Sequence, residues 1–354
     1  MPTAAFAEQR GFEFKEAFCQ IPTGFTIPPT VPIDVSQIAR YQESFVLVPM
    51  SAPPQYQALE SKLGYAAHYD PNATQEIPKD TLVMHYAGEL ILSEDGRGPY
   101  VIEIPDFSTL AIDACRMGNI SRFLPSLPSI SEVKMFDMPD EIRAKVATQN
   151  LRPQSYITVD GVIGMVFKTM RAITPGTMTG FSYYLPFFLN TNTIPLFYTE
   201  TGVPLDPAQT FLDIRRYFVI NLVAKICIRV DPLLRRDRSL SLAFHGHPLA
   251  QLVRQFDNDS NYSFEKFEED LRLHLQDFGK IIGNCYQSQK GHPTIQAWFR
   301  EHLQDFLLLN RILTESPEAM CDELLQQFQI LFPVATNRSL FRFKHENETK
   351  KRPL

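Results

Sequence analysis

The sequence lacks closely spaced cysteines, an excess of basic residues and long apolar runs, and each absence excludes a class of protein. Its five cysteines are scattered, without the CxxC or CxC pairs that indicate a structural zinc site. A net charge of −6 argues against direct binding to nucleic acid, which requires a basic face. The longest apolar stretches, such as residues 217–228, include Asn221 and Lys225 and are too short to span a membrane.

The first residues also lack the basic and apolar regions of a secretory signal. An odd, dispersed set of cysteines is typical of reduced thiols inside cells. We therefore expect a soluble intracellular protein, in the cytoplasm or the nucleus, and delivery into another cell stays open. His245 and His247 have no further metal-ligand types near them in the sequence, so we interpret this pair as a polar loop and expect no bound metal.

Apolar residues make up 44% of the chain and charged residues 21%, which is typical of a folded globular protein. Short β-branched and aromatic runs predict strands at residues 44–50, 81–86, 100–104, 145–151 and 156–168. Turns are predicted at Gly118-Asn119 and Asp160-Gly161. Beyond residue 205, apolar residues recur at helical spacing, and capping signals predict helices that begin at Asp206-Pro207, Ser263, Pro293 and Ser316-Pro317. The aromatic, proline-containing segment 185–203 is too irregular in its pattern for a helix.

These patterns predict an α+β protein, with short strands first and helices second. The expected parts are a Pro-rich arm (1–44), a mainly β domain (45–203), an α-helical domain (204–335) and a flexible basic tail (336–354).

Four motifs follow one another within the predicted β domain. They are LGYAA (63–67), EIPKDTLVMHYAGEL (76–90), LAIDACRMGNISRF (110–123) and TMRAITPGTMTGFSYY (169–184). In this order they resemble the motifs of SET-domain protein-lysine methyltransferases, and the resemblance extends over about residues 45–184. It implies a SET fold of short strands with a pseudoknot in the β domain, and it leaves the helical domain unassigned.

The resemblance further implies S-adenosylmethionine (SAM) as cofactor and a protein or peptide substrate with a target lysine, histone-like proteins included. It assigns the catalytic role to Tyr183. It assigns cofactor binding to Gly64, Tyr65, Arg122 and Phe123. It assigns substrate contacts to Tyr86, Tyr184 and Phe187. Candidates for an aromatic wall around the lysine are Phe187, Phe188, Phe197 and Tyr198, for which packing in the core is an equal alternative.

The chain departs from the family pattern in several places, among them a short insert between Leu92 and Thr109 and the absence of post-SET cysteines. Lys62 replaces the first glycine of the opening motif. Leu124-Pro125-Ser126 stand where the family has Asn-His-Ser. The acidic pair that follows Gly176 in the family is missing. A catalytically weak or inactive SET-like binding module is therefore the second hypothesis, and an unrelated interaction protein of strands and helices is the third.

Overall fold

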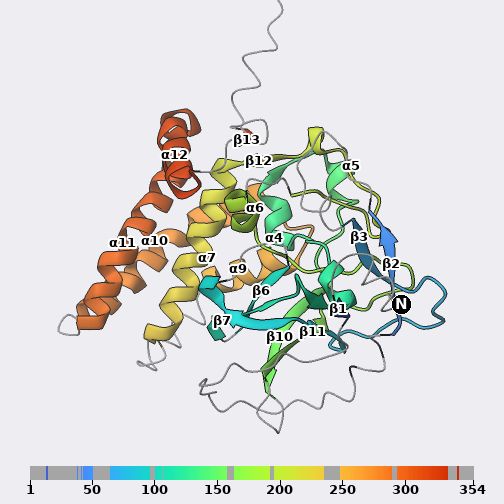
Figure 1. Ribbon diagram of the computed structural model, residues 1–354. Coiled ribbons are helices and arrows are strands. Elements are labelled where there is room, and N and C mark those ends of the chain that lie inside the picture. Colours follow the sequence, from blue (N-terminus) through green and yellow to red (C-terminus); the bar gives the residue numbers. More distant parts are fainter. Residues whose placement is uncertain are drawn as a thin grey trace, which may run out of the picture. The chain divides into compact units, whose positions relative to one another are not determined.

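The computed structural model divides the chain into two compact units (Figure 1). It describes residues 13–14, 38, 41, 43–50, 64–95, 100–105, 107–157, 163–191, 195–234, 248–288, 293–333 and 341–342. The first unit comprises residues 1–129, 141–188 and 193–206, and the second comprises residues 130–140, 189–192 and 207–354. Small, mainly antiparallel sheets dominate the first unit and helices the second, which is the predicted α+β class.

Short strands in separate small sheets build the first unit. One sheet pairs β2 (Phe45–Pro49) with β3 (Tyr65–Tyr69). A second has the order β5 (Glu89–Leu92), β7 (Phe107–Asp113), β6 (Val101–Ile104). A third has the order β10 (Leu151–Ile157), β11 (Ile163–Thr169), β4 (Leu82–His85). Two residues of β1 (Glu13–Phe14) pair in parallel with β8 (Met117–Gly118).

The structure confirms the strands predicted at 44–50, 81–86 and 100–104. The run predicted at 156–168 contains the end of β10 and most of β11, which pair with each other antiparallel. The prediction of a strand over 145–151 is wrong, because β10 begins only at Leu151. Asn150 explains the difference: its buried side chain bonds the Met178 carbonyl and the Gly180 amide, at 2.8 and 3.0 Å. The predicted turn at Asp160-Gly161 lies outside the described residues.

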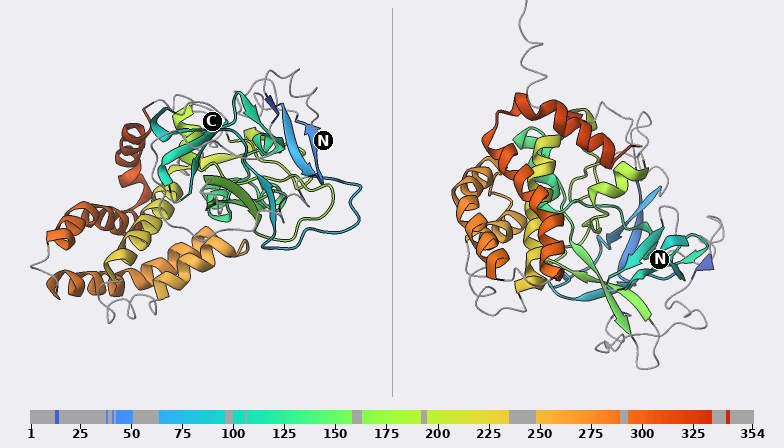
Figure 2. Two further views of the ribbon diagram at one scale, coloured as in Figure 1. Left: turned by 60° about the horizontal axis from the view of Figure 1, so that its bottom comes forward. Right: turned by 90° about the vertical axis from the view of Figure 1, so that its left-hand side faces the viewer.

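Helices build the second unit (Figure 2). They are α4 (Ile130–Lys134), α7 (Ile214–Leu234), α9 (Pro248–Asn258), α10 (Phe264–Ser288), α11 (Pro293–Thr314) and α12 (Pro317–Leu331). A small sheet has the order β13 (Phe341–Arg342), β12 (Phe211–Asp213), β9 (Phe136–Asp137). Among the described residues, no helix combines the length and apolar content needed to cross a membrane.

The predicted helix starts at Ser263, Pro293 and Ser316 are confirmed. The hydroxyl oxygen of Ser263 accepts the Lys266 amide at 3.2 Å, and that of Ser316 accepts the Ala319 amide at 3.3 Å. Each hydroxyl therefore satisfies an amide that lacks a partner inside its own helix.

Two helix predictions are wrong. Pro207 begins only a short 3₁₀ helix, η3 (Pro207–Gln209). The long helix α7 begins after Asp213, whose carboxylate accepts the Arg215 and Arg216 amides at 2.9 and 3.1 Å. The segment predicted to be irregular from residue 185 contains α6 (Leu185–Thr191), which tolerates its proline in the first turn. Helix α9 was not predicted. Three predicted features lie outside the described residues: the arm before Glu13, the pair His245 and His247, and the tail after Arg342.

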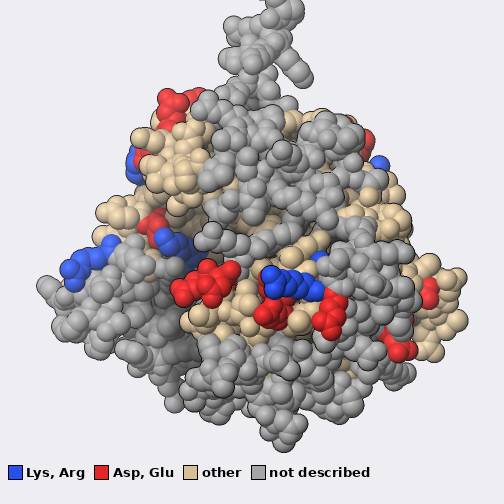
Figure 3. Space-filling model, in the orientation of Figure 1, with Lys and Arg blue, Asp and Glu red and all other residues tan. Residues whose placement is uncertain are grey.

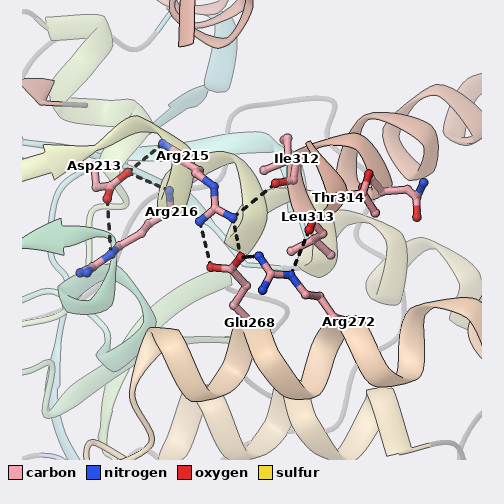
Figure 4. Close-up of polar contacts among 9 residues, drawn as sticks. Asp213, Arg215, Arg216, Glu268, Arg272, Ile312, Leu313 and Thr314 are labelled. Atoms are coloured by element: carbon pink, nitrogen blue, oxygen red, sulfur yellow. Dashed lines mark hydrogen bonds and ion pairs between the residues drawn. The ribbon is translucent and has the colours of Figure 1, made fainter. Parts of the chain in front are cut away.

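An ion network joins three helices of the second unit (Figure 4). Glu268 of α10 lies between Arg215 of α7 and Arg272 of α10, and the Arg215 Nη1 atom is 2.8 Å from its Oε2 atom. The same two guanidinium groups donate to the Ile312 and Leu313 carbonyls in the last turn of α11, at 3.3 and 2.9 Å. Cations at a helix C-terminus satisfy unpaired carbonyls and interact favourably with the helix dipole.

Candidate active site

The last motif of the first unit is bonded to the residues that directly follow Arg122-Phe123. The Leu127 amide donates to the Phe181 carbonyl at 3.1 Å, and Ser126 forms a parallel bridge with Phe181. The Tyr183 amide donates to the Ser126 hydroxyl at 3.2 Å. The Tyr183 hydroxyl donates to the Leu124 carbonyl at 2.6 Å. Backbone and side chain of Tyr183 are therefore both held by one short segment.

Asn119 orients the start of that segment. Its side chain is fully buried, donates to the His85 carbonyl of β4 at 2.9 Å and accepts the Ser121 amide at 3.1 Å. It thereby caps the 3₁₀ helix η2 (Ile120–Phe123) and fixes that helix against the neighbouring strand. The sequence predicted a turn at Gly118-Asn119 but not this contact, because the contact joins positions that are distant along the chain.

Three of the four residues predicted to bind cofactor lie together. The rings of Tyr65 and Phe123 meet edge to face with centroids 6.4 Å apart. The buried Arg122 guanidinium lies 4.2 Å from the Tyr100 ring and 5.5 Å from the Phe123 ring. Gly64 directly precedes Tyr65 and has a φ of 69°, a conformation that glycine adopts without strain.

Tyr86, predicted to contact substrate, is buried in the core. Its hydroxyl donates to the Tyr100 carbonyl at 2.7 Å. Burial raises the pKa of the Tyr86 hydroxyl well above its usual range, and the nearby Tyr183 adds to the shift whereas Arg122 opposes it. Aromatic contacts lead from Tyr86 through Phe167 and Phe181 to Tyr183, with centroid distances of 6.1, 5.0 and 4.8 Å.

The other predicted substrate residues differ in their environment. The Phe187 ring meets the half-buried Tyr183 ring edge to face at 5.4 Å. Tyr184 is exposed over 69% of its surface. The remaining candidates for an aromatic wall are buried almost completely, and they are Phe188, Phe197 and Tyr198. For these three the structure favours the alternative of core packing.

This arrangement gathers a fixed tyrosine hydroxyl, several aromatic faces and a buried guanidinium within one unit. Because the Tyr183 hydroxyl gives its proton to a carbonyl, its lone pairs stay available as acceptors. Sequence reasoning missed Tyr100, Ser126 and Asn119, which hold the predicted residues in place. Within the described ranges, no group of three or more His, Cys, Asp or Glu side chains could hold a metal ion.

Comparison with protein-family models found no match to the chain, and a search of curated proteins found no similar sequence.

Proposed function

We propose that the first unit is a SET-like domain with a pseudoknot, and that it transfers a methyl group from SAM to a lysine of a protein substrate. The observation that carries this proposal is the hydrogen bond from the Tyr183 hydroxyl to the Leu124 carbonyl. It brings the tyrosine expected to be catalytic to the chain that leaves Arg122-Phe123, where the cofactor is expected.

The side chains present fit SAM chemically. Gly64 has no side chain that would block a close ligand. The half-buried Tyr65 ring, backed by the buried Phe123 ring, would offer an aromatic face. Arg122 is a buried cation suited to a carboxylate. When bound, SAM would supply a methyl group on a positively charged sulfur atom.

The residues of the chain would then orient the acceptor lysine and keep its amine neutral. A free lysine has a pKa of about 10.4, so its amine must lose a proton before it can accept a methyl group. Removal of water by the rings of Tyr183 and Phe187 favours the neutral form. The Tyr183 oxygen, oriented by Leu124, can accept weak C–H···O contacts from the methyl group, and positioning supplies most of the rate enhancement.

Isothermal titration calorimetry with SAM tests the proposal. Wild type should release or absorb heat on binding, and Arg122→Ala should weaken binding at least tenfold because it removes the buried cation. Arg171→Ala is the matched control, since this arginine of the same unit is half exposed and pairs with Glu200. Absence of heat in wild type up to about 1 mM SAM would overturn the proposal.

The second candidate is a SET-like module that binds a lysine-containing segment without methylating it. It is favoured by Leu124-Pro125, which contribute no polar side chain where the family has Asn-His. Binding of a lysine peptide without any heat from SAM would support this candidate over the enzyme.

A further inference from the structure

Tyr184 has an unusual combination of backbone conformation and exposure. Its φ of 62° lies in the left-handed region, which among the described non-glycine residues is shared only by Asp80. The residue is nevertheless exposed over 69% of its surface. A non-glycine residue in this conformation costs about 1 kcal/mol, and asparagine or glycine would adopt it more readily.

Backbone contacts hold this conformation and do not depend on the tyrosine side chain. The Tyr184 amide donates to the Ser182 hydroxyl at 2.9 Å, and the Tyr184 carbonyl accepts the Phe187 amide at 3.0 Å. Residues in strained conformations concentrate at sites of function. The position therefore retains an exposed aromatic ring where the backbone alone would favour a smaller residue.

The chemistry of this ring and its position beside Tyr183 indicate what it binds. Successive residues of an extended peptide lie about 3.3 Å apart, so a lysine held at Tyr183 would place its sequence neighbours beside Tyr184. We propose that Tyr184 binds a second basic side chain, lysine or arginine, that flanks the target lysine of the substrate. This inference rests on the proposed function for the position of the target lysine.

Electrostatics supports a basic partner. An exposed tyrosine ring attracts a cation through its negative face. The chain carries a net charge of −6, which attracts basic segments over a distance. On the face shown in Figure 3, basic and acidic side chains of the described residues are interspersed.

Fluorescence anisotropy tests the inference without SAM, so its result does not depend on catalysis. The probe is a labelled peptide of Gly, Arg and Lys with one central lysine, compared with the same peptide in which the flanking basic residues are Gln. Tyr184→Asn should weaken binding of the basic peptide about three- to fivefold, whereas Tyr184→Phe, which keeps the ring, should bind like wild type. Val203→Ala, at another exposed apolar side chain, should have no effect.

The Gln peptide should bind wild type and Tyr184→Asn equally. Thermal melting should show Tyr184→Asn to be at least as stable as wild type, because asparagine tolerates the left-handed conformation. Equal affinity of wild type and Tyr184→Asn for the basic peptide, or no binding by wild type, would overturn the inference. The two proposals can fail separately. If wild type does not bind SAM but Tyr184→Asn still weakens binding of the basic peptide alone, the methyltransferase proposal is wrong and the binding role of Tyr184 is retained.

Discussion

The Tyr183 hydroxyl donates a 2.6 Å hydrogen bond to the Leu124 carbonyl across 59 positions of the chain. A second bond, from the Tyr183 amide to the Ser126 hydroxyl, keeps the same two segments in register. The two bonds fix the tyrosine beside the turn that carries Arg122 and Phe123. The arrangement uses a backbone carbonyl, which any residue at position 124 provides. It therefore does not require the Asn-His-Ser triplet that SET domains have at this place.

Tyr183→Phe separates the chemical role of this hydroxyl from its structural one. The variant loses one hydrogen bond, whose net contribution to the free energy of unfolding is about 1 kcal/mol, so the protein should remain folded. The proposed methyl transfer to a lysine peptide should fall at least a hundredfold, while the proposed SAM binding, measured by calorimetry, should change less than threefold. Equal transfer of labelled methyl groups by the variant and wild type would remove Tyr183 from the mechanism.

Local patterns in the sequence predicted several strands and the helices α10, α11 and α12, because strand alternation and helix caps act between near neighbours. Ser263 and Ser316 begin their helices as expected. The failures occur where distant contacts decide the structure. The side chain of Asn150 binds the backbone of Met178 and Gly180, so the residues before it do not form the predicted strand. The carboxylate of Asp213, and not that of Asp206, caps α7.

The candidate site was predictable in its members but not in how they are held. Motif order indicated Tyr65, Arg122 and Phe123, and the structure brings these three together. Hydrogen bonds such as that from the Tyr86 hydroxyl to the Tyr100 carbonyl hold the site. These bonds join side-chain and backbone atoms that meet only in the folded chain. No local pattern specifies such a pairing.

Asn119→Ala should destabilise the first unit strongly. The variant leaves the buried His85 carbonyl and Ser121 amide without the partners that Asn119 provides, and each buried polar group without a partner costs about 1–3 kcal/mol. We expect a loss of roughly 2–4 kcal/mol in urea unfolding followed by near-ultraviolet circular dichroism. Ser121→Ala is the matched control and should lose no more than about 1 kcal/mol, since it removes only one hydroxyl. Similar losses in both variants would contradict the central role of Asn119.

Glu268→Gln should destabilise the second unit. Glu268 is largely buried between Arg215 and Arg272, and the amide has nearly the same shape but no charge to balance the two guanidinium groups. We expect a loss of about 2–3 kcal/mol in the free energy of unfolding. Hydrogen exchange should increase at the end of α11, where both arginines bind carbonyls.

Glu269→Gln is the matched control for this network on the same helix. Glu269 is well exposed and pairs only at the surface with Lys266, so its replacement should change stability negligibly. If Glu268→Gln is as stable as Glu269→Gln, the buried network does not stabilise the unit.

Stability should decrease as the pH falls below about 6.5, the ordinary pKa of a histidine. Burial lowers the pKa of His85 to about 4, and burial also lowers the pKa of His68. A lowered pKa in the folded state means that the unfolded chain takes up protons first. The stabilisation from the neutral rings is therefore complete above pH 6.5 and is lost as the pH falls toward 4.

His85→Gln tests this origin of the pH dependence. For His85 the shift corresponds to about 3 kcal/mol as an upper limit. The free energy of unfolding, measured in urea at a series of pH values, should fall less steeply between pH 6.5 and 4 in His85→Gln than in wild type. Tyr156→Phe is the control, because it removes the hydroxyl that lies 3.0 Å from the His85 Nδ1 atom but leaves the ring buried, so it should retain the wild-type slope. Identical slopes for wild type and His85→Gln would show that other groups, His68 among them, produce the loss of stability in acid.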